Sequence, residues 1–257
     1  MANATSIKTI AVDLDRTLLH TDKTLSAHTV KVFETCKKCG MKIIVATARP
    51  FRDAKQYCEI IDADAIVVSN GARIIYGDQQ TDYGICPGSA EHLLKTLERY
   101  PTLRITLETG KCAYSNFPVS DYETILSDDL IGISKDERVL KILVHLDNEE
   151  TLALVKNALT DDLYYSIAHG YIMQIMNISA TKWNGIKAVL DIYRCSANET
   201  IYFGDDQDDI EPIKMCGIGV AVSNGIDEVK DVADYIAKSN DNDGVSEFLV
   251  HSILRNS

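Results

Sequence analysis

The sequence lacks the features that mark membrane proteins and nucleic-acid-binding proteins. No apolar run approaches the roughly 20 residues that a membrane helix needs. Positive charge is scarce, with 26 lysines and arginines against 38 aspartates and glutamates and a formal net charge of −12. This balance argues against non-specific attraction to nucleic acid or anionic lipid, although an acidic protein can still bind phosphate locally. We therefore expect a soluble protein that binds neither nucleic acid nor membrane.

The cysteines give no sign of a disulfide framework or a metal site. They are seven in number, scattered, and not preceded by a secretory signal peptide, so we expect reduced thiols and a cytoplasmic protein. Cys36 and Cys39 form a C-x-x-C, but both lie in a helical-looking stretch without a second pair of ligands. Ordinary packing is the expected role of both residues.

Strand and helix signals alternate in the first part of the chain. The expected strands are nearly unbroken apolar runs, as in strands buried on both faces, and Ser26 and Gly40 bound the first helix. The expected elements are strand Thr9–Leu14, helix Ala27–Cys39, strand Lys42–Ala46, helix Pro50–Ile60 and strand Ala65–Ser69. This alternation predicts an α/β fold with a Rossmann-like parallel sheet and helices on both faces, where ligands gather at the carboxyl ends of the strands.

The alternation of expected strands and helices is interrupted near Ile85 and resumes after Ile178. The middle segment predicts helices Ser89–Tyr100 and Glu149–Leu159, a hairpin of Leu103–Leu107 with Cys112–Ser115, and strands Leu140–Leu146, Leu163–His169 and Ile172–Asn177. Alternation resumes with helix Lys182–Tyr193, strand Thr200–Gly204, a helix from Ile210, strand Ile218–Val222 and a helix near Glu228. We therefore expect a core of residues 1–84 and 179–257, with an α+β domain inserted at 85–178.

Acidic residues follow two of the expected strands. Asp13 and Asp15 end the first strand, and their carboxylates would point the same way if the chain stays extended. The run Gly204-Asp205-Asp206-Gln207-Asp208-Asp209 follows another strand and brings further acids to the same edge of the sheet. Crowded carboxylates raise one another's pKa values unless a cation lies between them. Hard oxygen ligands suit Mg²⁺, so the sequence predicts a magnesium site at this edge.

Two residues suited to binding phosphate stand between the acidic clusters. Thr47 follows a strand and opens into an expected helix, and Lys182 lies in the first turn of another. A helix N-terminus offers free N–H groups, a hydroxyl adds a donor, and lysine supplies a positive charge. Either residue alone is a weak signal, because a threonine here is often only a cap and a helical lysine is usually solvated.

Taken in chain order, these elements resemble the motifs of the haloacid dehalogenase superfamily. Asp13-Leu14-Asp15-Arg16-Thr17-Leu18-Leu19 is similar to its D-x-D-G-T-L motif, and Ala46-Thr47-Ala48-Arg49 to its threonine motif. Lys182 stands for its lysine and the run from Gly204 to Asp209 for its G-D-x-x-N-D motif. The position of the inserted domain, together with Ser69-Asn70-Gly71-Ala72, looks like the Cof-type subgroup, also called subfamily IIB, which has a large α/β cap.

The resemblance implies catalytic and metal-binding roles. Asp13 would attack phosphorus and carry an aspartyl-phosphate, while Asp15 would protonate the leaving alcohol and later deprotonate water. Mg²⁺ would be held by the carboxylate of Asp13, the backbone carbonyl of Asp15 and the carboxylate of Asp205. Asp209 would complete the metal site by supporting the lysine and the metal's waters.

The resemblance also implies a phosphate site at Thr47, Ala48, Lys182 and Asp208, and here the sequence departs from the family. Arg16 and Ala48 replace glycines of the motifs, and Asp208 replaces an asparagine. An ionised carboxylate cannot donate to phosphate as an amide can, so Asp208 predicts slower turnover or a different mode of binding. Arg16 would narrow the entrance or disturb a turn that favours glycine.

The expected activity is that of a Mg²⁺-dependent phosphatase acting on a small phosphorylated metabolite, such as a sugar phosphate or a phosphorylated cofactor. One alternative is a catalytically weak protein that binds sugar phosphates or nucleotides, and another is a phosphosugar mutase. The substrate stays open, as does the choice between monomer and homodimer. Candidate selecting residues of the inserted domain are Tyr114, Asn116, His169, Tyr171 and Gln174.

Overall fold

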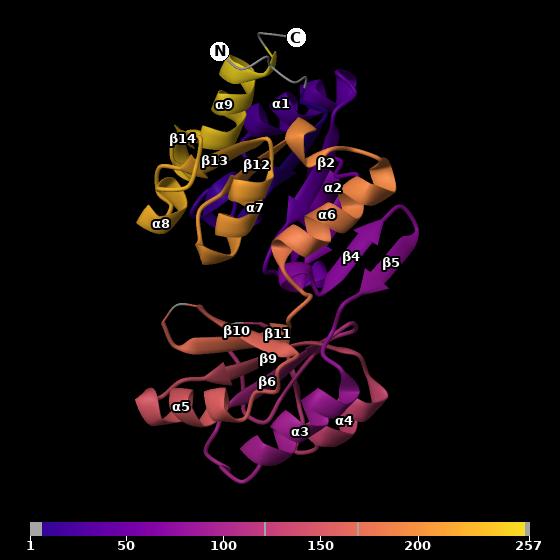
Figure 1. The fold of residues 1–257 in the computed structure, drawn as a ribbon, viewed down its shortest axis with the longest axis vertical. Coiled ribbons are helices and arrows are strands. Elements are labelled where there is room, and N and C mark those ends of the chain that lie inside the picture. The colour runs from indigo at the N-terminus through magenta and orange to yellow at the C-terminus, as the bar shows by residue number, and fades with distance from the viewer. Residues whose placement is uncertain (1–6, 121, 169, 255–257) are drawn as a thin grey trace. The chain divides into compact units, whose positions relative to one another are not determined.

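The structure is a computed structural model that describes residues 7–120, 122–168 and 170–254. The chain divides into two compact units, Met1–Thr81 with Thr181–Ser257, and Asp82–Ala180. Figure 1 shows the course of the chain through both. In the described ranges, no helix combines the length and apolar character needed to cross a membrane.

The first unit is built on a sheet with the strand order β14-β13-β12-β1-β2-β3-β4-β5. Neighbouring strands from β14 to β3 run parallel, and β4 is antiparallel to β3. The strands are β1 Thr9–Val12, β2 Lys42–Ala46, β3 Ala65–Val68, β4 Arg73–Tyr76, β5 Gln79–Asp82, β12 Thr200–Gly204, β13 Ile218–Val222 and β14 Tyr235–Ala237. The predicted parallel sheet is confirmed, and the antiparallel β4 extends it.

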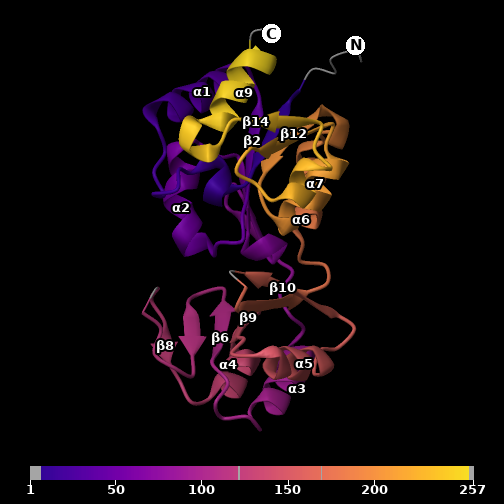
Figure 2. The same cartoon turned by 90° about the vertical axis from the view of Figure 1, so that its left-hand side faces the viewer.

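Helices cover both faces of this sheet, because alternate strand residues are apolar on both sides. In β2, Ile43 and Val45 belong to one buried cluster and Ile44 and Ala46 to another. The helices are α1 Ala27–Lys38, α2 Phe51–Ile60, α6 Lys182–Tyr193, α7 Ile210–Met215, α8 Asp227–Lys230 and α9 Gly244–Ser252. Figure 2 shows α1, α2 and α9 on one side of the strands and α6 and α7 on the other. The α/β class with helices on both faces is therefore confirmed.

The second unit has a sheet with the order β10-β11-β9-β6-β7-β8, antiparallel except for the β7–β8 pair. The strands are β6 Ile105–Thr109, β7 Ala113–Ser115, β8 Ile125–Leu126, β9 Val139–His145, β10 Leu163–Ala168 and β11 Ile172–Asn177. The helices are α3 Pro87–Leu97, α4 Leu130–Asp136 and α5 Glu149–Asn157. All three contribute to one buried cluster with β6, β9 and β11, which places them on the same face of the sheet.

Short turns flank the strands of the first unit, and all of them except Ala197–Glu199, which precedes β12, follow a strand. They are Leu14–Leu18, Ser69–Gly71, Ala197–Glu199, Gln207–Asp209 and Asn240–Asn242. The first two contain residues with left-handed φ angles, Arg16 at +59° and Asn70 at +58°. Gly71 has φ +98°, and a Cβ built there would lie 2.1 Å from the carbonyl oxygen of Thr181. Glycine therefore allows the turn after β3 to pack against the start of α6.

Candidate active site

The predicted site residues stand at the carboxyl ends of adjacent parallel strands. Asp13 follows β1, Thr47 follows β2 and Asp205 follows β12, and these strands are neighbours in the sheet. Lys182 is the first residue of α6, whose N-cap Thr181 accepts a hydrogen bond from the backbone N–H of Asn184. The parallel topology thus brings together side chains that are far apart in sequence.

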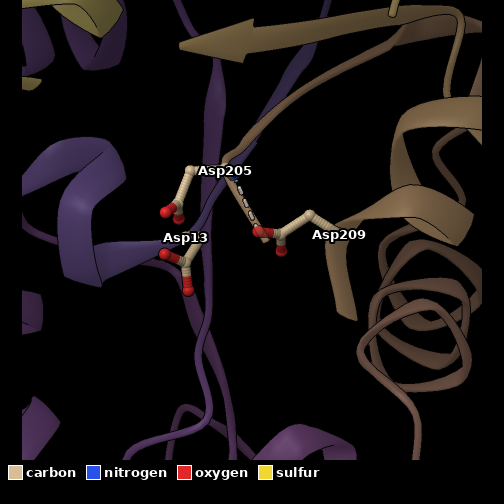
Figure 3. Close-up of side chains that lie close together, drawn as sticks. All are labelled: Asp13, Asp205 and Asp209. Atoms are coloured by element: carbon tan, nitrogen blue, oxygen red, sulfur yellow. Dashed lines mark hydrogen bonds between the residues drawn. The ribbon is translucent and has the colours of Figure 1, made fainter. Parts of the chain in front are cut away.

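Asp13, Asp205 and Asp209 form a buried cluster of carboxylates. Each offers an oxygen to a group whose members all lie within 4.8 Å of one another. The residues are only 4%, 6% and 0% exposed. Figure 3 shows the side chains of Asp13 and Asp205 close together, with Asp209 beside them. The two acidic motifs therefore meet at one point, as the sequence predicted.

Lys182 is the cation that is buried with these acids. Its Nζ donates to Oδ1 of Asp13 at 2.8 Å and to Oδ1 of Asp209 at 2.6 Å. Burial alone would lower the pKa of Lys182, but Asp13 and Asp209 raise that pKa well above its ordinary value, so the ammonium is charged. Burial raises the pKa of Asp13, Lys182 opposes this shift, and Asp209 and Asp205 add to it.

Asp209 organises the cluster through hydrogen bonds to both of its carboxylate oxygens. Oδ1 accepts from Lys182 and from the hydroxyl of Tyr202, each at 2.6 Å. Oδ2 accepts from the backbone N–H groups of Asp205 at 2.9 Å and Asp206 at 3.0 Å. A Cβ at Gly204 would lie 2.4 Å from the Cβ of Asp209, so glycine permits this close approach. Asp209 is thus engaged as an acceptor and holds the loop after β12 in place.

The charges of the cluster fit a divalent cation. Among the described residues, the cluster has three buried carboxylates, and the buried ammonium of Lys182 is hydrogen-bonded to two of them, Asp13 and Asp209. Burial, together with the charge of Asp209, raises the pKa of Asp205 to about 7. Oδ1 of Asp205 accepts from the hydroxyl of Thr17 at 2.9 Å, and within the described ranges no hydrogen bond engages its Oδ2. Oxygen donors with unbalanced negative charge are the environment that Mg²⁺ takes, so the residues present fit the predicted metal.

Asp15 does not join the acid cluster. β1 ends at Val12, and the chain enters a turn at Leu14, although Asp13 and Asp15 themselves keep extended φ and ψ angles. Arg49 donates to Asp15 from Nε at 2.5 Å and from Nη2 at 2.7 Å, and Lys23 Nζ donates at 2.6 Å. Burial would raise the pKa of Asp15, but the bonds from Arg49 and Lys23 lower it to about 2. The carboxylate is therefore ionised.

Thr47 and Asp208 both lie beside the turn that follows β3. Thr47 is buried, its carbonyl accepts from the backbone N–H of Asn70 at 3.1 Å, and its hydroxyl oxygen accepts from the backbone N–H of Arg49 at 3.2 Å. Asn70, which has φ +58°, donates its side-chain amide to Asp208. Ala48 lies in the turn between Thr47 and Arg49 and is partly buried. The carboxylate that replaces the motif's asparagine is thus paired with an amide from another strand end.

Arg49 and Asn70, which hydrogen-bond to Asp15 and Asp208, belong to the sequence motifs but were not predicted as site residues. Arg49 stands two residues after Thr47, and Asn70 follows β3 at the same edge as the acids. Both positions follow strands of the parallel sheet, which was the available signal. Tyr202 gave no such signal, because a tyrosine inside an apolar strand reads as a core residue.

The second unit's candidate residues have mostly local partners. The hydroxyl of Tyr114 donates to Glu137 at 2.9 Å, and Asn116 bonds the backbone of Ile105 and Leu103 at 2.8 Å each. The side-chain oxygen of Gln174 accepts from Lys141 at 2.6 Å. Tyr171 is exposed, and His169 lies outside the described residues. Tyr114 and Asn116 thus fix their own sheet and turns.

Replacing Asp209 with asparagine should destabilise the protein by roughly 3–5 kcal/mol, because Lys182 loses a buried counter-charge. An asparagine side chain has one oxygen and one NH₂ group. The NH₂ group would face either Lys182 and Tyr202 or the two backbone N–H groups, and it cannot accept a hydrogen bond from any of them. Urea denaturation in chelator measures the free energy of unfolding without metal. The control is Asp206→Asn, an exposed neighbour whose Oδ1 accepts from Gln207 N and whose replacement keeps an acceptor. A loss at Asp209 no greater than at Asp206 would contradict the anchoring role.

Comparison with known proteins places the chain among enzymes of one family. The sequence model of the haloacid dehalogenase-like hydrolases matches residues 10–249. The chain is 26% identical to a Bacillus subtilis protein named 5-amino-6-(5-phospho-D-ribitylamino)uracil phosphatase YitU, over 93% of this chain and 95% of that protein. A second B. subtilis protein with the same activity in its name, YwtE, is 24% identical over 95% of this chain and 97% of its own length.

Solved structures share the fold along almost the whole chain. BT1666 of Bacteroides thetaiotaomicron, described as a phosphatase of the haloalkanoate superfamily, has a TM-score of 0.87 at 21% identity and covers 98% of this chain and 97% of its own. BT4131, described as a subclass IIB sugar phosphatase, has a TM-score of 0.79 at 20% identity, covering 95% of this chain and 98% of its own. At these identities the likeness establishes the architecture.

Proposed function

The chain belongs to the haloacid dehalogenase-like hydrolases, as its motifs indicated, and from this premise we propose that it is a Mg²⁺-dependent phosphatase acting on a small phosphorylated metabolite. The observation that carries the proposal is the buried carboxylate of Asp13, which accepts a hydrogen bond from Lys182 at 2.8 Å and lies within 4.8 Å of a carboxylate oxygen of Asp205. A nucleophile, a cation for phosphoryl oxygens and a set of metal ligands converge there.

In the proposed reaction, a carboxylate oxygen of Asp13 attacks the phosphorus and the bond to the ester oxygen breaks. The leaving oxygen takes a proton from Asp15, and an aspartyl-phosphate remains on Asp13. Water then attacks the phosphorus and gives a proton to Asp15, which releases inorganic phosphate and restores Asp13. Mg²⁺ held by the Asp13 carboxylate, the Asp15 carbonyl and the Asp205 carboxylate would offset charge on the transferred group.

Asp15 has to change partners to act as the acid. Its carboxylate is held by Arg49 and Lys23, and its pKa of about 2 keeps it ionised in this arrangement. Moving away from these cations would let its pKa rise toward the range needed for proton transfer. We therefore assign Arg49 and Lys23 to holding Asp15 in a resting position.

The phosphoryl oxygens would be bound by Thr47, Lys182 and the backbone beside Ala48. Lys182 already contacts the nucleophile at 2.8 Å, so it can reach a group attached there. The amide that the motif's asparagine would supply at position 208 has a substitute in Asn70, which in this arrangement donates to Asp208. Asn70 is thus our candidate for the missing amide donor.

For the substrate, we propose a sugar phosphate or a phosphorylated cofactor precursor. The support comes from the relatives, which are named for a phosphorylated ribitylaminouracil and for sugar phosphates. A weak phosphate-ester-binding protein is the second candidate, favoured by the pairing of Asp15 with two cations. Screening phosphorylated metabolites for Mg²⁺-dependent phosphate release tests the first, and tight binding without release would support the second.

We also propose that the second unit is a cap that selects the substrate. Its own buried cluster draws on Leu93, Ile142 and Val155, whereas the described clusters of the first unit draw only on that unit. Each unit therefore has a core with which to fold separately.

Replacing Asp82–Ala180 with a short Gly/Ser linker should keep weak hydrolysis of p-nitrophenyl phosphate, because the nucleophile and the acid cluster lie in the first unit. Discrimination among natural esters, measured as ratios of kcat/KM across the panel, should fall by roughly tenfold or more, since binding energy from the cap is lost. Cooperative thermal unfolding of the shortened chain is the control for folding. If it still ranks natural esters as the intact protein does, selection resides in the first unit.

A further inference from the structure

Arg16 is a residue of the site to which the proposed reaction gives no task. It occupies the turn after β1, where the family motif has glycine, and its φ is +59°. L-residues disfavour this left-handed conformation, which glycine adopts without strain. Arginine therefore occupies a position whose backbone conformation favours glycine. Contacts with neighbouring residues hold Arg16 in this conformation.

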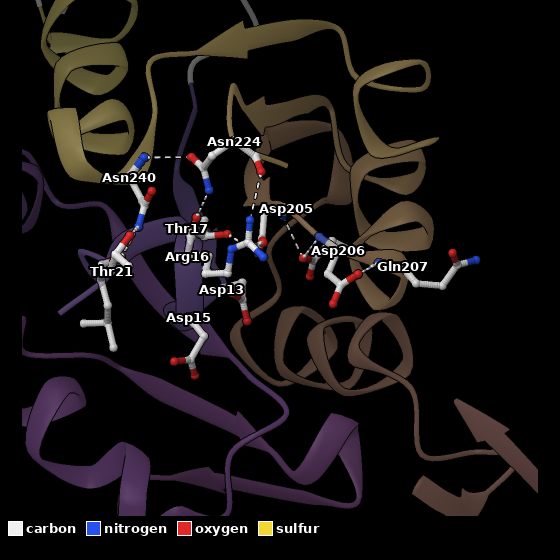
Figure 4. A network of polar contacts seen from close by, with 12 residues as sticks. Asp13, Asp15, Arg16, Thr17, Thr21, Asp205, Asp206, Gln207, Asn224 and Asn240 are labelled. Carbon is white, nitrogen blue, oxygen red and sulfur yellow. Dashed lines mark hydrogen bonds and ion pairs between the residues drawn. The ribbon is translucent and has the colours of Figure 1, made fainter. Parts of the chain in front are cut away.

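Asn224, in the loop after β13, fixes both the backbone and the side chain of Arg16. Asn224 Nδ2 donates to the Arg16 carbonyl at 2.7 Å, and Arg16 Nη2 donates to the Asn224 carbonyl at 3.3 Å. Asn224 is itself held, because its Oδ1 accepts from the backbone N–H of Asn240 at 2.9 Å. Figure 4 shows this chain of contacts beside Asp205. The guanidinium is therefore positioned and does not simply extend into solvent.

The guanidinium lies next to the acid cluster with most of its donors uncommitted. Arg16 Nε is 3.9 Å from Oδ2 of Asp205, and the side chain is 63% exposed. Of its five N–H groups, one is hydrogen-bonded to Asn224 among the described residues. A planar guanidinium with open donors binds carboxylate or phosphate oxygens two at a time.

The transferring phosphoryl group does not need Arg16, because Thr47 and Lys182 are assigned to it and both are buried. We propose that Arg16 is a specificity residue that binds a second anionic group, a carboxylate or another phosphate, on the leaving-group part of the substrate. This inference rests on the proposed phosphatase activity. Because Arg16 and Asp13 both neighbour Asp205, the two anionic groups would be joined by only a short carbon chain.

Matched pairs of phosphate esters test this inference. The first pair is 3-phosphoglycerate and glycerol 3-phosphate, and the second is propane-1,3-diol bisphosphate and 3-hydroxypropyl phosphate. Arg16→Met should lower kcat/KM by roughly tenfold to a hundredfold, mainly through KM, for at least one of the two esters that carry a second anionic group. This is the effect of losing one charge-assisted contact. The matched ester should change by less than about threefold. A loss in the first pair would identify the second anionic group as a carboxylate, and a loss in the second pair would identify it as a phosphate.

Arg194→Met is the matched control. Arg194 is exposed and also has positive φ, 54°, but it caps α6 at the end opposite Lys182. Its replacement should alter neither pair, while Arg16→Lys should recover part of the loss. Equal losses on both members of each pair would instead assign Arg16 to the transferring phosphoryl group or the metal. No change on any ester would also overturn the proposal.

A binding measurement separates this inference from the proposed function. If the wild-type protein releases phosphate from no ester, the phosphatase proposal fails. Calorimetric titration with 3-phosphonopropionate, propane-1,3-diylbisphosphonate and propylphosphonate, in the presence of Mg²⁺, then tests the role of Arg16. Arg16→Met should weaken binding of at least one of the two probes that carry a second anionic group by roughly tenfold or more, and should leave the affinity for propylphosphonate unchanged. Equal affinity of the wild-type protein for all three probes would reject the second anionic site.

Discussion

Replacing Asp13 with asparagine should lower kcat by about a thousandfold or more, because the reaction loses its attacking oxygen. Asparagine has the same shape and its amide oxygen can still accept from Lys182, so the side chain should stay in place. The measurement is the kcat for the best ester of the panel at saturating Mg²⁺. Circular dichroism and thermal unfolding establish that the variant is folded.

The control for this experiment is Asp62→Asn. Asp62 is exposed after α2 and has φ +51°, a conformation that asparagine also tolerates. This variant should keep the wild-type kcat. If Asp13→Asn retains even a tenth of the wild-type rate, a barrier difference of only about 1.4 kcal/mol, Asp13 is not the nucleophile.

Removing divalent metal should reduce phosphate release to background, and adding Mg²⁺ should raise it by roughly a hundredfold or more. The reason is the excess of buried negative charge at Asp13, Asp205 and Asp209, to which a phosphate ester would add more. Calcium should restore activity poorly, since it prefers more ligands and longer bonds. Initial rates after chelation and readdition of each metal provide the measurement.

Thermal unfolding gives a second measure of the same site without turnover. Mg²⁺ at about 100 times its Kd should stabilise the wild-type protein by about 2.7 kcal/mol. Asp205→Asn should lose this increase, whereas Asp227→Asn, which removes an exposed acid on α8, should keep it. Full activity in excess chelator, after verified metal removal, would refute the metal requirement.

The sequence predicted the sheet well where its strands are buried on both faces. Ile43, Ile44, Val45 and Ala46 form an unbroken apolar run, and the structure buries all four. The acidic motifs were informative for a related reason, because both directly follow such strands and therefore had to meet at one edge. The expected first strand was too long, since Leu14 is buried but already belongs to a turn.

Other features depend on contacts that local sequence does not encode. The sequence pattern predicted neither β4 at Arg73–Tyr76 nor β5 at Gln79–Asp82, and the segment of β5 reads Q-Q-T-D, without an apolar face. Asp15 and Arg49 pair across 34 positions, and Asn70 and Asp208 across 138. Spacing in the sequence gives no information on such pairs until the order of the strands is known. The pairing of Asp15 with Arg49 was therefore visible only in the structure.

The discontinuity of the first unit determines when the acid cluster can form during synthesis. A nascent chain grows from its N-terminus, so Asp82–Ala180 is complete before α6 and β12 exist. Until then β1 can pair only with β2, because its other neighbour is β12. Lys182, Asp205 and Asp209 all arrive in the last third of translation. A partly made chain thus contains only one acid of the cluster, Asp13. Repulsion among the three acids arises only when the last strands of the sheet dock.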